Sequence, residues 1–322
     1  KIEEQFDFKP SYIVKEEMGF LKWMKEIWKK LNSSHPDIVL GSEFGISTII
    51  IILHKFVTKS HYKIVIINDD SYDMLVNNNQ FTKRHARAVK AMMPLVDDVI
   101  NVEPRVAAYN QQKYQKGIYF PIICNDVIAK KRLERVLPIS QNYVSKYQLE
   151  GKKVLLFVGR LVVLKNVKFA LRAFIKANLD NTIFVIVGDG SEKEKLEKIA
   201  AGNPAVIFTG RLEGDELYAW YNVGQVFTLP SYKEPFGAVT NEALVAGCKV
   251  LISKDAGSNC LVKDGKNGYI IDPHHETKFI EKLKLAFYSM KPLKMQLVVK
   301  ENMMVSSFEE HIKSLYARME NL

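Results

Sequence analysis

The chain has 322 residues, of which 47% are hydrophobic and 25% charged, and its 46 basic and 36 acidic side chains give a net charge of +10. This composition excludes an intrinsically disordered chain, a collagen and a disulfide miniprotein. At this length we expect two domains of roughly 150 residues each. The charge is evenly spread, with 22 basic and 17 acidic side chains in residues 1–150 and 24 and 19 in residues 151–322. We therefore expect anionic small molecules or an anionic membrane surface as partners, and no nucleic acid.

The three cysteines, Cys124, Cys248 and Cys260, form no CxxC pair, which favours a reducing compartment over a disulfide framework or a zinc ribbon. The longest uncharged apolar run, residues 46–53, is less than half of the roughly 20 residues that cross a bilayer, and the first residues lack the pattern of a signal peptide. We expect a cytoplasmic protein, at most peripheral on the inner face of a membrane.

In the first 137 residues, apolar runs alternate with longer segments, which indicates β-α-β units and a parallel sheet. The run 49–52 in the segment between the first two strands is β-branched and favours a strand. Neighbouring parallel strands need a crossover of about a dozen residues, so we predict a helix there instead. In chain order the sequence predicts a helix at 20–31, strands at 36–40 and 62–67 with the crossover helix 47–59 between them, a strand at 98–102, and an apolar run at 118–123.

From Lys152 onward the alternation is regular. Apolar residues recur at i, i+3, i+4, i+7 and i+8 from Val167, as on one face of a helix. A last helix is predicted to start near Ser307, because Ser307 and Glu310 make a capping box. The predicted strands of this half are residues 154–158, 183–187, 205–209, 225–229, 249–252 and 269–271.

The sequence thus predicts the α/β class, with two Rossmann-like, doubly wound parallel-sheet domains that face a cleft. We place the first domain at residues 1–137 and the second at residues 151–305. Pro138 and the polar stretch after it indicate a linker at 138–150, and residues 306–322 hold the last helix.

The strongest local pattern is LPSYKEPFGAVTNEA at residues 229–243, which follows a predicted strand and opens a helix. Ligands of doubly wound sheets bind at this carboxyl edge. A turn with Pro235 and Gly237 just before a helix directs free backbone N–H groups outward and predicts a phosphate site. These N–H groups belong to Phe236, Gly237, Ala238 and Val239.

Two glutamates flank this predicted phosphate site. Glu234 precedes the helix, and Glu242 lies roughly 8 Å further along it at about 1.5 Å per residue. Carboxylates would repel a phosphate that they touched, so they are better explained as acceptors for hydroxyl groups. One carboxylate for a sugar and one for a ribose, with a diphosphate between them, describe a nucleotide sugar.

Cations are predicted at the same sheet edge. Gly159 and Arg160 end the first strand of this half, Lys165 follows, and Arg211 ends the strand 205–209. Arg160 and Lys165 could offset most of the charge of a diphosphate leaving group and stabilise it as the charge develops.

In order and spacing, several motifs resemble those of the retaining GT-B glycosyltransferases of family four, also called glycosyl transferases group 1. They are VGRL at 158–161 with Lys165-Asn166, VGDG at 187–190, LPS at 229–231 with Glu234 and Glu242, AG at 246–247, and DGKNG at 264–268.

The resemblance implies a GT-B architecture with an acceptor-side domain at 1–137, a donor domain at 151–305, and a helix at 306–322 that crosses back to the first domain. It implies that Glu234 holds the sugar hydroxyls, Glu242 the ribose, and Arg160 and Lys165 the diphosphate. The expected catalytic residues are Arg160, Lys165 and Glu234, and the expected donor-binding residues are Gly159, Arg160, Lys165, Gly188, Arg211, Glu234, Pro235, Phe236, Gly237, Ala238, Val239 and Glu242.

The resemblance also implies a reaction. The nucleotide diphosphate leaves from the front face with retention at the anomeric carbon, and the leaving phosphate takes the proton of the acceptor. No protein base, metal or tightly bound cofactor is then required, and UDP- or GDP-type sugars are the expected donors.

Three departures from the family matter. The family often has His-Asp after the strand that matches residues 62–67, where this chain has Asn68-Asp69, so Asn68 or Asp69 is the expected sugar or acceptor contact. Cys260 stands where the family usually has an acidic residue. We expect the first strand and Gly-rich loop of the family, roughly 40–60 residues by usual domain size, to lie outside this sequence.

The helix at 20–31 places Phe20, Met24, Ile27 and Leu31 on one face and its lysines elsewhere. Such a helix could dock on a membrane surface, but a layer helix with a solvated basic face is the favoured interpretation. The pair His274-His275 lacks a third ligand at metal spacing, and no metal is predicted.

The sequence therefore predicts a retaining, metal-independent glycosyltransferase that acts on a glycan or lipid-linked acceptor in surface polysaccharide synthesis. Two alternatives stay open, a catalytically impaired nucleotide-sugar-binding partner subunit and another GT-B enzyme such as an epimerase.

Overall fold

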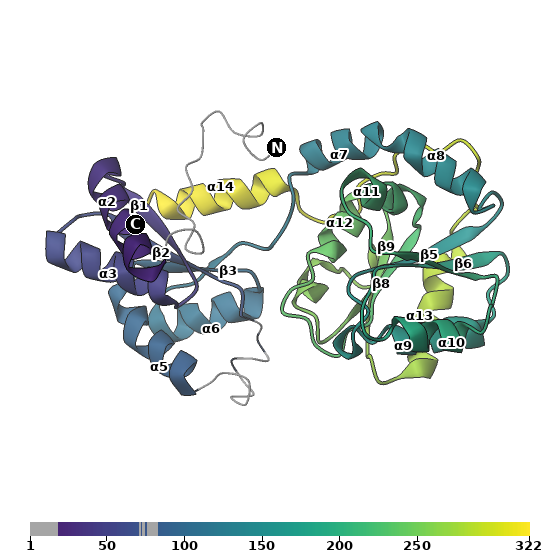
Figure 1. The fold of residues 1–322 in the computed structure, drawn as a ribbon, viewed down its shortest axis with the longest axis horizontal. Helices are drawn as coiled ribbons and strands as arrows, with labels where there is room; N and C mark the ends of the chain where they lie inside the picture. The colour runs from purple at the N-terminus through teal and green to yellow at the C-terminus, as the bar shows by residue number, and fades with distance from the viewer. Residues whose placement is uncertain (1–18, 71, 73–74, 76–82) are drawn as a thin grey trace.

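The computed structural model describes residues 19–70, 72, 75 and 83–322, so residues 1–18 of the predicted first domain lie outside the described residues. Figure 1 shows two lobes with a parallel β-sheet in each. The predicted α/β class with two parallel-sheet domains is confirmed.

The sheet of the first lobe, which we call sheet A, has four parallel strands in the order β1-β2-β3-β4. Its strands agree closely with the predicted ones, except that only two residues of the apolar run 118–123 form a strand. The described elements of this lobe are α2 (Phe20–Ser34), β1 (Ile38–Ser42), α3 (Ile46–Thr58), β2 (Lys63–Asn68), α5 (Lys83–Met92), η2 (Met93–Leu95), β3 (Asp98–Asn101), α6 (Pro104–Tyr114) and β4 (Ile118–Tyr119).

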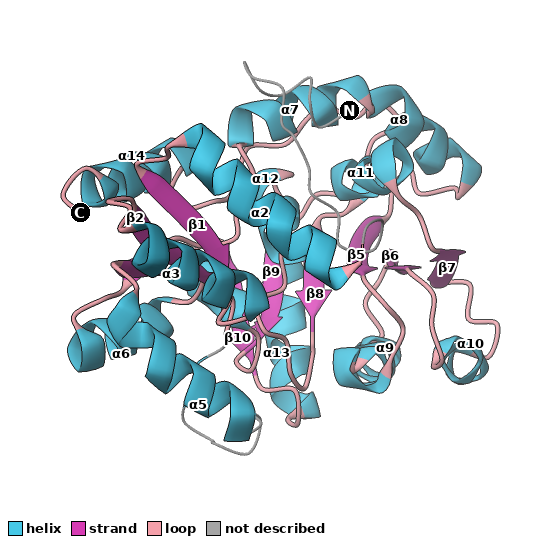
Figure 2. Ribbon diagram, turned by 60° about the vertical axis from the view of Figure 1, so that its left-hand side comes forward, coloured by secondary structure: helices cyan, strands magenta, loops and turns pink. Residues whose placement is uncertain are grey.

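The β-branched segment between β1 and β2 is a helix, as the topology argument predicted. α3 turns Thr48, Ile50, Ile51 and His54 into the interior. The parallel register of β1 and β2 requires a crossover here, and this requirement outweighs the strand preference of four consecutive isoleucines. α2 packs beside α3 (Figure 2) and has no fully buried residue.

The sheet of the second lobe, sheet B, has six parallel strands in the order β10-β9-β8-β5-β6-β7. The chain runs outward from β5 to β7 and then returns to place β8 on the other side of β5, so the strand order reverses between β5 and β8. Its elements are β5 (Lys153–Val158), η3 (Val163–Lys165), α9 (Val167–Ala177), β6 (Thr182–Val187), α10 (Lys193–Ala200), β7 (Val206–Gly210), α11 (Gly214–Val223), β8 (Val226–Leu229), α12 (Val239–Val245), β9 (Lys249–Ser253), η4 (Gly257–Leu261), β10 (Gly268–Ile271) and α13 (Glu276–Tyr288).

The segment predicted as a linker, residues 138–150, is helical for most of its length. Two helices, α7 (Asp126–Arg135) and α8 (Leu137–Lys146), occupy the region, and α8 packs on α11 of the second lobe. Tyr143 is buried and stacks on Trp220 with ring centroids 4.7 Å apart. Pro138, which suggested a break, lies in the first turn of α8, where its missing N–H costs nothing.

The last helix, α14 (Phe308–Met319), begins with the predicted capping box of Ser307 and Glu310. It lies against the first lobe (Figure 1), although the elements that precede it in the chain, from β5 to α13, belong to the second lobe. Both guanidinium contacts of Arg318 with the Asp98 carboxylate are 3.0 Å long, and Leu315 packs on the core of sheet A. The chain therefore crosses between the lobes twice, after β4 and before α14.

None of the helices in the described part of the chain is both long and apolar enough to span a bilayer.

Candidate active site

The loops after β5 and β8 leave the sheet where the strand order reverses, and this is the point where doubly wound sheets bind ligands. Beside that point, at the carboxyl ends of β5, β6 and β7, lies a cavity of about 510 Å³. Its lining residues are Val158, Gly159, Arg160, Val187, Gly188, Asp189, Gly190, Arg211 and Leu212.

Two glycines allow the loops that form this cavity to approach each other. A Cβ on Gly188 would lie 1.9 Å from the carbonyl oxygen of Gly159, and a Cβ on Gly190 would lie 2.5 Å from that of Leu161. Both glycines also have a positive φ, which side chains rarely adopt. The glycines of this turn are therefore required by backbone packing, and they bring two backbone segments to the cavity.

The two arginines of the cavity have different surroundings. Arg211 is exposed and its Nε lies 3.0 Å from Glu213 Oε1. Arg160 is also exposed, but it has no ion-pair partner among the residues that the structure describes. Arg160 is thus the cation that an anionic ligand can reach without displacing a neighbouring carboxylate.

Lys165 and Glu234 form a salt bridge between the loops after β5 and β8. Their side chains are only 16% and 13% exposed, so the pair is well shielded from water. The backbone joins the same loops, because the Tyr232 N–H donates to the Leu164 carbonyl at 2.9 Å. The structure therefore brings together two of the predicted site residues that are 69 positions apart in the sequence.

The turn after Glu234 is held by the loop at residues 255–258. Gly257 N donates to Glu234 O at 3.0 Å and Ser258 N donates to Phe236 O at 2.7 Å. Gly237 has φ +93°, and a Cβ there would lie 2.6 Å from the Leu229 side chain. Within the described residues, the amides of Phe236, Gly237 and Ala238 donate to no carbonyl or side chain, and α12 opens directly after them at Val239, as predicted.

Glu242 lies in the first turn of α12 and is held by two tyrosines of α11. The Tyr221 hydroxyl donates to Glu242 Oε2 at 2.7 Å, and the Tyr218 hydroxyl donates to Oε1 at 3.2 Å. Burial, followed by the Glu242 charge, raises the pKa of both phenols well above the ordinary value. The sequence analysis missed both tyrosines; their spacing of three residues, which places two side chains on one face of a helix, was the available signal.

The two residues predicted as sugar or acceptor contacts at the edge of sheet A, Asn68 and Asp69, differ in their burial. Asn68 is 3% exposed, and its amide donates to Asn101 Oδ1 at 3.4 Å, which also accepts from Asn110 at 2.8 Å. Asn68 therefore belongs to a buried amide network, whereas Asp69 is exposed.

The sulfur of Cys260 accepts a hydrogen bond from the Tyr119 hydroxyl at 3.6 Å. Burial raises the pKa of the Cys260 thiol to about 11, so the thiol stays neutral.

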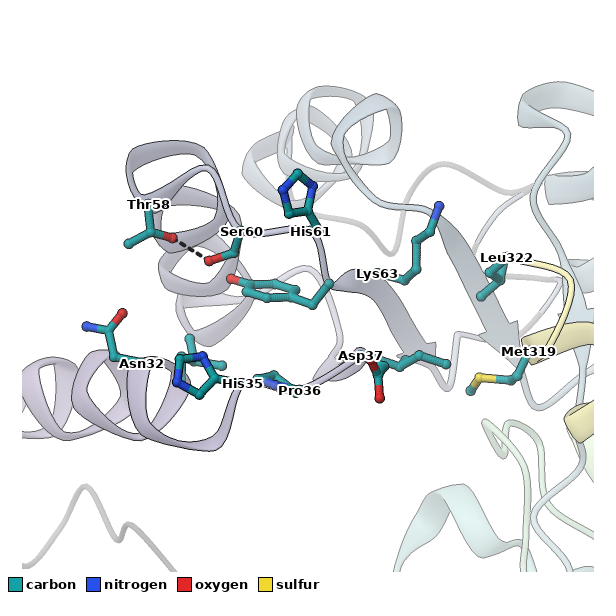
Figure 3. A pocket seen from close by; sticks show the side chains of 13 residues that line it. Asn32, His35, Pro36, Asp37, Thr58, Ser60, His61, Lys63, Met319 and Leu322 are labelled. Carbon is teal, nitrogen blue, oxygen red and sulfur yellow. Dashed lines mark hydrogen bonds between the residues drawn. The ribbon is translucent and has the colours of Figure 1, made fainter.

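A larger cavity, of about 680 Å³, lies at the opposite end of sheet A (Figure 3). It is bounded by the segments that enter β1 and β2, with Asp37 and Lys63 among its lining residues, and by Met319 at the end of α14. Ligands of parallel sheets bind at the carboxyl ends of strands, so the position of this cavity at the amino ends separates it from the candidate site.

No group of three His, Cys, Asp or Glu side chains in the described ranges could hold a metal ion.

Comparisons with known proteins identify the family of the chain. The family model for Glycosyl transferases group 1 matches residues 140–303, about half of the chain. Sulfoquinovosyl transferase SQD2 of Arabidopsis thaliana is 35% identical over 136 residues, which are 41% of this chain and 26% of that protein. A GDP-mannose-dependent alpha-mannosyltransferase of Mycolicibacterium smegmatis is 34% identical over 123 residues, 38% of this chain and 31% of the relative. The chain thus spans about a quarter to a third of the length of these relatives.

Among solved structures, Anabaena HepE in complex with UDP superimposes with a TM-score of 0.73 over 94% of this chain and 82% of that chain, at 14% sequence identity. At this identity the likeness concerns the fold, which is the GT-B architecture of two facing Rossmann-like domains.

Proposed function

The chain belongs to the family of glycosyl transferases group 1, and on that premise we propose that it is a retaining glycosyltransferase. In this proposal it moves a sugar from a nucleotide diphosphate sugar to a glycan or lipid-linked acceptor. The observation that carries the proposal is the salt bridge of Lys165 with Glu234 at the point where the strand order of sheet B reverses. It places a cation and a hydroxyl acceptor side by side, which are the two groups that a sugar diphosphate needs.

The donor would lie along the carboxyl edge of sheet B. The cavity between the Gly159 and Gly188 loops offers backbone groups to a nucleotide base. The diphosphate would bind Arg160 and Lys165, and the sugar hydroxyls would bind Glu234. UDP bound in the HepE structure and GDP-mannose as donor of the mycobacterial relative support UDP and GDP sugars as the first donors to test.

The proposed chemistry follows from these charges. The bond between the anomeric carbon and the diphosphate oxygen breaks, the acceptor oxygen bonds to the same face of that carbon, and the acceptor proton passes to the leaving phosphate. Negative charge grows on the diphosphate as the bond breaks, so Arg160 and Lys165 bind the transition state more tightly than the ground state. Each charge-assisted contact contributes about 1.5–3 kcal/mol.

The proposal includes no metal and no tightly bound cofactor, because two positioned cations can offset the charge of a diphosphate. We expect the transfer rate to be unchanged after the protein is treated with EDTA and returned to buffer without EDTA. A rate that returns only when Mg²⁺ or Mn²⁺ is added would contradict this part of the proposal.

The acceptor side of the proposal rests on α3. Its outer face presents an apolar stripe, the neighbouring helix α2 carries exposed lysines, and Phe56 at the end of the stripe is 83% exposed. Apolar side chains next to basic ones are typical of peripheral contact with an anionic membrane, which would bring a lipid-linked acceptor to the cleft from the cytoplasmic side. The stripe consists of Ile46, Ile49, Leu53, Phe56 and Val57.

Membrane contact can be measured by flotation with vesicles that contain phosphatidylglycerol. We expect wild type to float and a Leu53→Ser, Phe56→Ser variant to remain in the dense fraction. Tyr288→Ser, which removes an equally exposed aromatic side chain from the second lobe, is the matched control. Equal flotation of all three proteins would contradict contact through α3.

The central experiment is a calorimetric titration with UDP, GDP, ADP and their sugar conjugates, followed by a search for transferred sugar. We expect one nucleotide series to bind, and Glu234→Gln to weaken the sugar conjugate more than the free diphosphate. Glu309→Gln, at an exposed position of α14, should bind like wild type. If neither the conjugates nor the diphosphates bind, the donor site is wrongly assigned.

A nucleotide-sugar-binding subunit without turnover is the second candidate, and the buried Asn68 favours it because the family often has a His-Asp at that position. Binding of the conjugate with no consumption over hours would support this candidate. Conversion of the donor sugar without an acceptor would instead indicate another GT-B enzyme, such as an epimerase.

A further inference from the structure

The carboxylate of Glu242 is fixed by two phenols rather than left free in the cleft. Tyr218 and Tyr221 lie three residues apart on α11, so both side chains point from one face of that helix toward α12. Each hydroxyl donates to a different oxygen of Glu242. The carboxylate plane is therefore set by α11, because rotation about the last side-chain bond would break both hydrogen bonds.

Both phenols are held in place by their own neighbours. Tyr221 is completely buried, and its ring packs edge-on against Tyr218 with centroids 5.8 Å apart. The guanidinium carbon of Arg132 lies 3.6 Å from the centre of the Tyr218 ring, and Arg132 Nε lies 3.3 Å from Asp215 Oδ1. Arg132 of α7 and Asp215 at the start of α11 thus fix the position of the Tyr218 ring, whose hydroxyl donates to Glu242.

Two phenol donors do not use up the acceptor capacity of a carboxylate. Each oxygen of an ionised carboxylate has about two acceptor positions, and each tyrosine occupies one of them. The raised pKa values keep both phenols protonated, so they remain donors at neutral pH. One acceptor position on each oxygen is left, and this pattern matches a pair of adjacent hydroxyl groups.

We propose that Tyr218 and Tyr221 are positioning residues that orient the Glu242 carboxylate toward the 2′ and 3′ hydroxyls of a ribose, so that the site selects ribonucleotides over 2′-deoxyribonucleotides. The inference rests on the proposed function, because it needs a nucleotide at the edge of sheet B. It goes beyond that function, since it assigns residues outside the donor loops and a selectivity that follows from them. A deoxyribose would leave one oriented acceptor position without its donor, and such losses are costly at a shielded site.

The test compares the dissociation constants of UDP and 2′-deoxy-UDP, and of GDP and 2′-deoxy-GDP, by calorimetry. We expect wild type to prefer the ribonucleotide by about 10-fold to 100-fold, as for a hydrogen bond to a charged group. Tyr218→Phe should reduce this preference to about threefold and leave the affinity for the deoxyribonucleotide unchanged. Glu242→Gln should reduce it at least as much.

Tyr147→Phe is the matched control, because the Tyr147 ring packs on Trp220 of the same helix and its hydroxyl is not one of the two donors to Glu242. It should keep the wild-type preference. Tyr221→Phe is the second variant, and thermal unfolding of each protein shows whether it is folded. The Tyr218 variant keeps its ring over Arg132 and is the more conservative change.

The outcomes separate the inference from the function on which it rests. If wild type binds no nucleoside diphosphate, the proposed function fails and this inference fails with it. If wild type binds but Tyr218→Phe weakens the ribo- and deoxyribonucleotide equally, or changes neither, the tyrosines only satisfy a shielded acid and the inference alone is overturned. If wild type binds ribonucleotides and deoxyribonucleotides equally well, the inference alone is also overturned.

Discussion

At the carboxyl edge of sheet A, Asn68 and Asn101 are buried in an amide network with Asn110. At the same edge of sheet B, an arginine lines an open cavity and a salt bridge joins the loops after β5 and β8. Both edges come from the same β-α-β pattern, and both have polar residues after their strands. Sheet A uses those residues to satisfy one another, and sheet B leaves hydrogen-bonding capacity for a ligand. Fold alone therefore does not make an edge into a site; the partners available to each polar group decide it.

The contrast predicts its largest effect at Lys165. Lys165→Met removes the cation from the proposed diphosphate site and leaves the poorly exposed Glu234 without its partner. We expect the transfer rate to fall by about 10²–10³-fold, the usual effect of losing one group that stabilises developing charge. Steady-state kinetics with the donor found by titration measures it.

Lys176→Met is the control for that experiment, because Lys176 forms a salt bridge of 2.8 Å with Glu276 on the surface of the same lobe. It should leave the transfer rate within a factor of two. Equal rates for the Lys165 and Lys176 variants would remove the cation from the proposed mechanism.

The second prediction compares glycines of the two lobes. Gly188→Ala would place a Cβ 1.9 Å from the Gly159 carbonyl oxygen, so the two loops of the cavity must separate. We expect nucleotide affinity to fall by roughly 10-fold to 100-fold, since displacements of about 1 Å have effects of that size. Gly45→Ala after β1 is the counterpart in sheet A, where the nearest atom would be 3.9 Å away, and it should bind like wild type.

The third prediction concerns the support behind Tyr221. Lys300 is partly buried, and its ammonium donates to the carbonyl oxygens of Tyr221 and Asn222 at 3.0 and 2.6 Å. Lys300→Met leaves both carbonyls without this donor, and we expect the free energy of unfolding to fall by about 1–2 kcal/mol. Chemical denaturation measures it.

The same lysine gives a pH dependence with a definite sign. Burial lowers the pKa of Lys300 below its unfolded value of 10.5, so between the two values the unfolded chain holds the proton more tightly. Stability from this group therefore rises as pH increases toward 10.5. Relative to Lys300→Met, the wild type should gain stability over that window; a difference that is constant with pH would contradict the burial argument.

The fourth prediction sharpens the role of sheet A. Asn68→Ala removes one member of the amide network, and we expect a loss of about 1 kcal/mol in the free energy of unfolding. Donor KM should change by less than a factor of two, because the side chain is buried in that network. A large rise in donor KM without a change in stability would indicate that Asn68 contacts the sugar.

Comparison of these regions also shows what the sequence could predict. The strands of both sheets and the capping box of Ser307 follow from local patterns. The helix α8 was missed because Pro138 is compatible with either a linker or a first helical turn. The contacts of Glu242 were out of reach, because Tyr218 and Tyr221 precede β8 and meet α12 only when the helices pack.

Burial of Asn68 was equally hidden from the sequence. Its partner Asn101 is 33 positions away, and only the register of β2 and β3 sets Asn68 opposite Asn101. A polar residue after a strand therefore indicates a site only when its neighbours across the sheet are also known.

The smallest expected effect separates the two arginines of the cavity. Arg211 is exposed and already paired with Glu213. Its electrostatic interaction with a bound diphosphate would therefore be screened by water and salt, with a screening length of about 10 Å at 0.1 M. Arg211→Gln should weaken nucleotide binding by about twofold at low ionic strength and have no measurable effect at 0.5 M salt. Arg160 has no such partner in the described chain, so Arg160→Gln should weaken binding at both salt concentrations. If the two variants show the same salt dependence, both cations act only through the general field of the cleft, and direct binding of the diphosphate by Arg160 is wrong.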